Sequence, residues 1–341
     1  MTKKINVAIV GVTGAVGEML LKILQERAFP VENLYPLASE RSLGKTVNFA
    51  RKTLDVLDLA TFDFTGVDIA FFSAGIDVSR EYVPIAAAAG CVVIDNTSCF
   101  RYDADVPLVV PEVNPECIAE YTQRNIIANP NCTTIQMVVA LKPLYDAVGI
   151  SRIQVSTYQA VSGSGSKGLR ELISQIEELL NGRSVKPNVY SQQIAFNVLP
   201  QIDAFEDNGY TREEMKMVWE TRKILKDQSI QVNATAVRVP VLYGHSEAIN
   251  IELKSPLTVV QARKLLNQAA GVKVVDDPVK AKFPTPLQNA VGHDEVFVGR
   301  IRQDISHPCA LNLWVVADNV RKGAATNAVQ IAEILLRDYL S

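Results

Sequence analysis

Three glycines spaced three residues apart follow the first apolar run of the chain. The run covers residues 5–10, and the segment Gly11-Val12-Thr13-Gly14-Ala15-Val16-Gly17 leads from it into a stretch where apolar residues recur at helical spacing. Glycines permit a tight turn and close approach of the backbone, and the start of a helix attracts a pyrophosphate. A glycine turn with a purely structural role has the same spacing. Its place at a strand-to-helix junction favours a dinucleotide-binding site.

The rest of the first third alternates short apolar runs with helical patterns. Continuous apolar strands separated by helices predict a parallel sheet covered on both faces, which is a doubly wound, Rossmann-type α/β domain. Asp77 is expected to cap a helix that ends before Gly90. The further expected strands cover residues 33–37, 68–74, 91–96, 107–110 and 125–129.

After about residue 130 the pattern changes to long alternating runs, which predict an α+β domain with a largely antiparallel sheet. Thr211-Arg212-Glu213-Glu214 has the pattern of a capping box, so a helix is expected to begin there. The amphipathic stretch 324–339 is expected to return to the first domain. The predicted division is 1–130, 131–318 and 319–341. The expected strands cover 152–161, 230–240, 247–253, 295–301 and 311–317, and the expected helices 168–180, 213–226 and 259–270.

Composition and cysteine content exclude several classes of protein. The 341 residues carry 34 Lys and Arg against 37 Asp and Glu, a near-neutral balance that argues against nucleic-acid or membrane-surface binding. No apolar run has the length of a membrane span or a signal-peptide core, so a cytoplasmic protein is expected. Five cysteines and three histidines at irregular spacing predict neither a disulfide framework nor a metal site.

The loop after the second expected strand bears on the choice of cofactor. An NAD site would place an acidic residue at the end of this strand, where the chain instead has Ser39-Glu40-Arg41-Ser42. Arg41 with Ser39 and Ser42 can surround a 2′-phosphate, whereas an inward-pointing Glu40 would repel it. A solvated loop is the alternative. We expect NADP.

Cys132 is the candidate nucleophile. Asn129-Pro130-Asn131-Cys132-Thr133-Thr134 ends a strand and opens a helix, where backbone N–H groups and the helix dipole stabilise a thiolate. A buried structural cysteine explains the same position equally well. His245, expected where one strand turns into the next, is the candidate acid–base partner, and a structural histidine is its alternative.

Six segments together resemble one family. Gly-Val-Thr-Gly-Ala-Val-Gly, Ser-Glu-Arg-Ser, Asn-Pro-Asn-Cys-Thr-Thr, Tyr-Gln-Ala-Val-Ser-Gly-Ser-Gly, Arg-Val-Pro-Val-Leu-Tyr-Gly-His-Ser-Glu and Asp-Asn-Val-Arg-Lys-Gly-Ala-Ala occur in the order found in aspartate-semialdehyde dehydrogenases. The resemblance covers essentially the whole chain. It implies a homodimer that uses NADPH to convert 4-phospho-L-aspartate to L-aspartate 4-semialdehyde, for the biosynthesis of lysine, threonine, methionine and diaminopimelate.

The resemblance also implies roles for individual residues. Cys132 forms the thioester, His245 is the general acid–base, and Gln159 orients the substrate, although a backbone hydrogen bond would equally explain that glutamine. Arg238 clamps the substrate carboxylate with two parallel hydrogen bonds. Glu213 binds the ammonium, and Lys216 and Arg101 bind the phosphate. Taken alone, Glu213 and Lys216 would be a surface ion pair and Arg101 an exposed arginine. The implied cofactor contacts are Gly11, Thr13, Gly14, Ala15, Val16, Gly17, Ser39, Arg41, Ser42, Ser162, Gly163 and Asn319.

Two other functions fit the same pattern. One is a different thiol-dependent acyl-phosphate reductase, of the N-acetyl-glutamyl-phosphate or glyceraldehyde-phosphate type. An amine-binding glutamate argues against an acetylated substrate. The other is a non-catalytic paralogue that binds a dinucleotide, which the retention of Cys132, Gln159, Arg238 and His245 disfavours.

Overall fold

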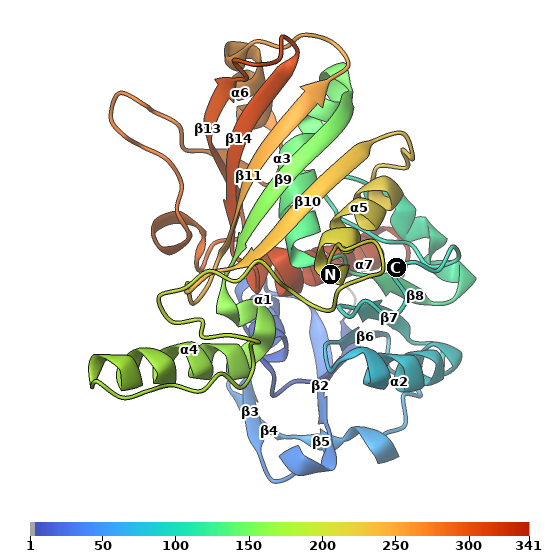
Figure 1. The fold of residues 1–341 in the computed structure, drawn as a ribbon. Coiled ribbons are helices and arrows are strands. Elements are labelled where there is room, and N and C mark those ends of the chain that lie inside the picture. Colours follow the sequence, from blue (N-terminus) through green and yellow to red (C-terminus); the bar gives the residue numbers. More distant parts are fainter. Residues whose placement is uncertain (1–3, 341) are drawn as a thin grey trace. The chain divides into compact units, whose positions relative to one another are not determined.

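The computed structural model describes residues 4–340, which form two compact units. The first unit comprises Met1–Asn131 and Ala324–Ser341, and the second comprises Cys132–Gly323. The last helix therefore belongs to the same unit as the N-terminal strands (Figure 1).

The first unit is built on a six-stranded parallel sheet in the order β5-β2-β1-β6-β7-β8. This order confirms the doubly wound prediction and turns back between β1 and β6, where such sheets bind dinucleotides at the carboxyl ends of the strands. The strands are β1 (Ile5–Val10), β2 (Val31–Ala38), β5 (Leu57–Asp58), β6 (Ile69–Phe72), β7 (Val92–Asp95) and β8 (Ile126–Ala128). A hairpin of β3 (Thr46–Phe49) and β4 (Lys52–Asp55) was not predicted.

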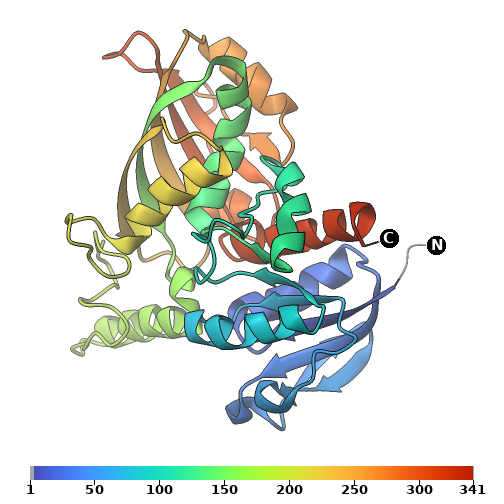
Figure 2. The same cartoon turned by 90° about the vertical axis from the view of Figure 1, so that its right-hand side faces the viewer.

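Helices cover both faces of this sheet. α1 (Ala15–Glu26), α7 (Thr326–Asp338) and the 3₁₀ segment Pro115–Gln123 share one apolar cluster with alternate residues of β1, β6 and β7. The buried residues of α2 (Ile76–Ala88) lie outside that cluster, and α2 packs on β6 and β7 from the other face (Figure 2). The unit is thus a three-layer α/β structure.

Two local predictions in the first unit are wrong. Residues 107–110 form no strand and make one bridge, between Leu108 and Ala128. The Asn114 side chain donates a hydrogen bond to the Leu108 carbonyl oxygen and accepts one from the Val110 N–H, each at 2.9 Å. These backbone groups therefore have partners without a neighbouring strand. Asp77 does not cap α2, because Gly75 occupies the N-cap at φ 103° and Asp77 pairs with Arg80 in the first turn.

The second unit contains a mixed sheet in the order β10-β9-β11-β14-β13-β12. Its three central pairs are antiparallel, as predicted, whereas β10 with β9 and β12 with β13 are parallel. The α+β prediction is therefore confirmed, with the difference confined to the outer strands. The strands are β9 (Ile150–Gln159), β10 (Gln231–Arg238), β11 (His245–Leu253), β12 (Val272–Val274), β13 (Val296–Gln303) and β14 (Ala310–Ala317).

One face of this sheet carries helices α3 (Cys132–Val148), α5 (Arg212–Ile224) and α6 (Val259–Gln268) (Figure 2). The capping box at Thr211 and Glu214 is confirmed at the start of α5. On the opposite face alternate strand residues are exposed or half-buried, and the rings of Tyr158 and Trp314 lie 5.5 Å apart. A fourth helix, α4 (Gly165–Leu180), packs on the segment 190–199 in a small core of its own.

Candidate active site

The glycine turn in the first unit is sterically constrained. Gly11 adopts φ 86°, and a Cβ there would come within about 3.1 Å of the backbone of residues 73 and 74. A Cβ on Gly17 would lie 2.3 Å from the Gly11 carbonyl oxygen. Gly14 forms the N-cap of α1 without a capping side chain, which leaves N–H groups of the first helical turn for a ligand. The turn therefore fits a pyrophosphate bound at the helix start.

The loop after β2 also fits the expected cofactor. β2 ends at Ala38, and Ser39, Glu40 and Arg41 are exposed in the short 3₁₀ turn that follows. The Ser42 hydroxyl is buried and lies 3.4 Å from the Thr13 hydroxyl, so this loop adjoins the glycine turn. No acidic residue stands at the end of β2 itself, whereas a guanidinium and two hydroxyls follow it. These groups suit a 2′-phosphate.

Cys132 is the first residue of α3 and is half-buried. The loop after β14 packs closely against it, because a Cβ on Gly323 would lie 2.8 Å from the Cys132 Cβ. A side chain at position 323 would therefore displace the Cys132 side chain. Gly323 was not singled out from the sequence, although it lies in the segment 318–325 that resembles the family.

His245 is the first residue of β11 and is fully buried. Its Nδ1 accepts a hydrogen bond from the Ala160 N–H at 3.0 Å, and its Nε2 has no hydrogen-bond partner among the described residues. Burial and the nearby Arg238 guanidinium lower the pKa of His245 to about 3. The ring is thus neutral near pH 7, and since Nδ1 is an acceptor, the proton resides on Nε2.

Arg238 lies at the end of β10 in register with Gln159, the last residue of β9. One nitrogen of its guanidinium, Nη1, donates to the Ala160 carbonyl oxygen at 2.7 Å. A Cβ on Gly163 would come 2.7 Å from that nitrogen and 3.4 Å from His245 Nε2, so Gly163 separates the two side chains at close contact. Arg238 also lines a cavity of about 250 Å³ together with Tyr190 and Asp203. An anchored guanidinium facing a small cavity suits a carboxylate ligand.

A buried polar network runs from Gln159 into α5. Gln159 Nε2 donates to Glu213 at 3.0 Å, the other Glu213 oxygen accepts from Lys216 at 3.0 Å, and Lys216 also contacts Asp203 at 2.9 Å. Burial alone would lower the pKa of Lys216, but the carboxylates of Glu213 and Asp203 outweigh it and raise the pKa. The alternative of a surface ion pair is wrong, because both Glu213 and Lys216 are largely buried.

Arg101 and Asn319 both have defined hydrogen-bond partners. Arg101 belongs to the first unit, where its guanidinium donates to the carbonyl oxygens of Asn129 and Asn96 at 2.9 and 2.8 Å. It is buried, so the alternative of an exposed arginine is wrong. In the second unit, Asn319 Oδ1 accepts from the Ser162 hydroxyl and the Gly244 N–H. It ties together the loops that precede α4 and β11.

Asp318 organises the loop that contains Asn319 and Gly323. Its carboxylate accepts hydrogen bonds from the N–H groups of Val320, Arg321 and Gly292 at 2.9 to 3.0 Å. Asp318 is nearly fully buried and was not predicted as a site residue. The signal available was its place at the head of the segment 318–325. Its contacts indicate that it positions its neighbours.

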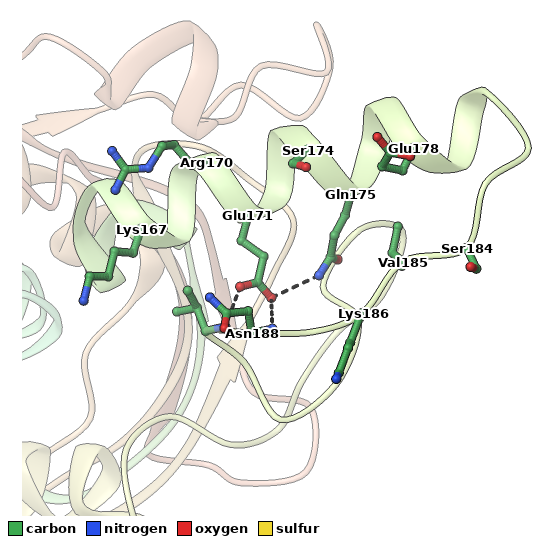
Figure 3. A pocket seen from close by; sticks show the side chains of 11 residues that line it. Lys167, Arg170, Glu171, Ser174, Gln175, Glu178, Ser184, Val185, Lys186 and Asn188 are labelled. Carbon is green, nitrogen blue, oxygen red and sulfur yellow. Dashed lines mark hydrogen bonds between the residues drawn. The ribbon is translucent and has the colours of Figure 1, made fainter.

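A larger pocket, of about 580 Å³, lies between α4 and the segment that follows it, and none of the predicted site residues lines it (Figure 3). Its central Glu171 accepts from the N–H groups of Asn188 and Val189 and from Gln175, and Gln175 in turn binds the N–H groups of residues 194 and 195. These contacts fasten the segment that supplies Tyr190 to the cavity of Arg238. We therefore assign this pocket a structural role.

Residues 4–340 contain neither a metal-binding cluster nor a membrane-spanning helix. No group of three or more His, Cys, Asp or Glu side chains is arranged to hold a metal ion. No helix in that range combines the length and the apolar character needed to cross a membrane.

The first unit is Rossmann-type and has a constrained glycine turn, as in dinucleotide-dependent oxidoreductases. The second unit adds a cysteine at a helix start and a buried neutral histidine. Two family models match the chain: "Semialdehyde dehydrogenase, NAD binding domain" over residues 6–121 and "Semialdehyde dehydrogenase, dimerisation domain" over residues 141–322. The chain belongs to the aspartate-semialdehyde dehydrogenase family.

Individual relatives match over the full length. The chain is 69% identical to aspartate-semialdehyde dehydrogenase of Legionella pneumophila over 340 residues, which cover 100% of this chain and 98% of that protein. The crystal structure of aspartate semialdehyde dehydrogenase II of Vibrio cholerae complexed with ASA aligns with a TM-score of 0.98 at 62% identity, covering 99% and 100% of the two chains. The crystal structure of aspartate semialdehyde dehydrogenase with NADP from Candida albicans aligns with a TM-score of 0.78 at 26% identity, covering 98% of each chain.

Proposed function

We propose that this protein is an aspartate-semialdehyde dehydrogenase that reduces 4-phospho-L-aspartate to L-aspartate 4-semialdehyde and releases phosphate, in the pathway to lysine, threonine, methionine and diaminopimelate. The observation that carries the proposal is the charge pattern of the second unit. A buried carboxylate, Glu213, is bonded to a buried ammonium, Lys216, and Arg238 faces a small cavity lined also by the Lys216 partner Asp203. A small substrate with an ammonium, a carboxylate and a phosphate matches these charges.

Three residues of the second unit bind the two ends of the substrate. Arg238 is held at Nη1 by the Ala160 carbonyl, and the rest of its guanidinium binds the substrate carboxylate. Glu213 binds the substrate ammonium. Lys216 binds the phosphate. The same role is proposed for Arg101, as the family resemblance implies. Gln159 orients the substrate and holds Glu213 through its side-chain amide.

The covalent step takes place at Cys132. Its thiolate attacks the acyl carbon, so that a C–S bond forms as the C–O bond to phosphate breaks, and phosphate leaves as the anion. NADPH, held by the Gly11–Gly17 turn with Ser39, Arg41 and Ser42, supplies a hydride when bound. The neutral His245 donates a hydrogen bond from Nε2–H to the oxygen that becomes negatively charged as the hydride reaches the thioester carbon, and this bond stabilises the oxyanion. The oxyanion then re-forms the carbonyl of the semialdehyde as the C–S bond breaks and Cys132 leaves as the thiolate.

The remaining cofactor contacts fall on the loops before α4 and after β14. Ser162, Gly163 and Asn319 would hold the nicotinamide end of the cofactor, and Thr13, Gly14, Ala15 and Val16 would hold the pyrophosphate. The bond from Ser162 to Asn319 supports a shared role for these two loops.

The test is turnover with three substrates and one variant. Purified, reduced protein given the semialdehyde, phosphate and NADP should produce NADPH, and should consume NADPH on aspartyl phosphate. N-acetyl-glutamyl phosphate and glyceraldehyde phosphate are the comparison substrates. Faster turnover of either one would overturn the assignment of 4-phospho-L-aspartate as the substrate. Cys132→Ser should lose at least about 10³-fold in kcat, and full turnover in this variant would overturn the thioester mechanism.

We also propose that the protein is a cytoplasmic homodimer. The five cysteines, all within residues 4–340, form no disulfide, as expected in a reducing compartment. The face of the second sheet that carries Tyr158 and Trp314, opposite α3, supplies the dimer contact. Sedimentation equilibrium should give twice the chain mass, and Tyr158→Asp should shift it toward the monomer. A monomeric wild-type protein would contradict this proposal.

A further inference from the structure

Buried polar atoms without hydrogen bonds are concentrated at one place in the second unit. Of eight such side-chain atoms among the described residues, five belong to Gln136, His245 and Glu247. They comprise both amide atoms of Gln136, both carboxyl oxygens of Glu247 and Nε2 of His245. The His245 nitrogen has a role in the proposed reaction, whereas Gln136 and Glu247 have none. Unsatisfied buried groups are rare in folded proteins and call for an explanation.

These two residues lie next to the two residues of the proposed chemistry. His245 and Glu247 are two apart on β11, so their side chains share the face of the sheet on which α3 packs. Cys132 and Gln136 are four apart on α3, so they share one face of that helix. α3 runs along β9 and β11 within this unit (Figure 1).

Glu247 and Gln136 are also neighbours of each other. Burial raises the pKa of Glu247, and the nearby Gln136 amide acts in the opposite direction. No hydrogen bond of good geometry joins the two side chains. Burial prevails and holds the pKa of Glu247 well above its ordinary value, which favours the protonated, neutral form of the carboxyl. A neutral carboxyl and an amide each have a donor and an acceptor, and can satisfy each other.

Leaving such a pair unbonded would cost about 1–3 kcal/mol for each group. Apolar residues of similar size at the two positions would avoid that cost, and are often neutral or stabilising in such sites. The polar pair must therefore contribute something other than stability.

We propose that Glu247 and Gln136 form a hydrogen-bonded positioning pair, which holds the first turn of α3 and the start of β11 at the spacing that Cys132 and His245 need to act on the same substrate carbon. The inference rests on the roles proposed above for Cys132 and His245. Neither Glu247 nor Gln136 touches the substrate. The link acts across the helix–strand packing, at one turn from the thiol and two residues from the imidazole.

The experiment compares Glu247→Leu, Gln136→Leu, the double variant and the conservative Glu247→Gln. The measurements are kcat and KM for the semialdehyde, and the rate of iodoacetamide modification of Cys132, followed on its peptide by mass spectrometry. Ile249→Val, the next buried residue on the same face of β11, is the matched packing control. Unfolding temperatures are measured for all variants.

Cutting the link should lower kcat about 10–100-fold with KM within about twofold, because a misplacement of about 1 Å has effects of that size. The double variant should be no slower than either single variant, since both break one link. Glu247→Gln should keep kcat within about threefold and restore the alkylation rate that Glu247→Leu loses. Ile249→Val should keep the wild-type kcat and alkylation rate.

Three results would overturn the positioning pair. Wild-type kcat in Glu247→Leu would assign the residue to packing alone. Effects that multiply in the double variant would mean that the residues act independently. A Glu247→Gln variant as slow as Glu247→Leu would contradict a link that an amide can replace. Because full activity in Cys132→Ser would instead overturn the thioester mechanism, the two failures are distinguishable.

Discussion

Lys216→Met removes the cation from the buried network of α5. Lys216 Nζ lies 3.0 Å from Glu213 and 2.9 Å from Asp203, and the side chains are 12%, 7% and 38% exposed, respectively. Removing one partner of a buried ion pair costs about 3–5 kcal/mol, because the remaining charge stays desolvated. Asp203 is exposed enough to be hydrated after the change, so it adds little to the loss of stability. Glu213 keeps its hydrogen bond from Gln159. We therefore expect a loss of about 3 kcal/mol.

The loss should be visible as a change in thermal unfolding. For a protein of this size, about 2 °C of unfolding temperature corresponds to 1 kcal/mol, so the fall should be roughly 6 °C by calorimetry. The double variant Glu213→Gln, Lys216→Met has no buried charge left without a partner and should recover most of that fall. Lys22→Met breaks an exposed Lys–Glu pair on α1 and should change stability by less than about 0.5 kcal/mol.

The same variants separate stability from substrate binding. If Lys216 binds phosphate, its loss should raise the phosphate KM about 10–100-fold, as expected for a hydrogen bond to a charged group. The double variant should recover its unfolding temperature but not its phosphate affinity. An unfolding temperature of Lys216→Met equal to the wild-type value, or a double variant less stable than the single one, would refute the reasoning about the buried pair.

Three further predictions concern the cofactor turn, the cofactor loop and the histidine. Gly17→Ala, which brings a Cβ to 2.3 Å from the Gly11 carbonyl oxygen, should abolish NADP binding measured by fluorescence titration, and retained affinity would contradict the turn geometry. Arg41→Ala should raise the KM for NADP about 10–100-fold and leave that for NAD unchanged; equal changes for both cofactors would exclude a 2′-phosphate contact. Burial and Arg238 lower the pKa of His245 from 6.5 to about 3. Between these two pH values the unfolded chain binds a proton that the folded chain does not, so the free energy of unfolding decreases as the pH falls. Between pH 7.5 and pH 5, His245 should account for about 2 kcal/mol of the decrease in the free energy of unfolding of the wild-type protein. In denaturant titrations, the decrease measured for His245→Gln should be smaller by that amount.

Local features of the fold were predictable because their causes are local. The capping box at Thr211 and Glu214 depends on four consecutive residues, and it begins α5 as expected. The alternation of apolar strands and helices identified the doubly wound sheet, and the close approach of Gly17 to the Gly11 carbonyl oxygen lies within a few residues of the chain. The prediction of a strand at residues 107–110 was wrong because the Asn114 side chain binds the backbone groups that strand pairing would use, and Asn114 lies after the predicted strand.

The candidate site was predictable in its residue types but not in its electrostatics. Spacing alone placed Glu213 and Lys216 on one helical face, but could not tell whether water or protein covers that face. Gly323, Asp318, Gln136 and Glu247 were not singled out, because each matters through a neighbour that is distant in the sequence or hidden in the fold.

By itself, the sequence determined where the chain turns, which segments form helices and strands, and which residue types are available for chemistry. These properties depend on local sterics, hydrogen bonding and apolar periodicity. Only the tertiary structure decided which polar groups lose water and which partners replace it. It made His245 neutral through burial and the Ala160 N–H, and turned Glu213 and Lys216 into a buried pair. Desolvation depends on everything packed around a group, and no short stretch of sequence contains that information.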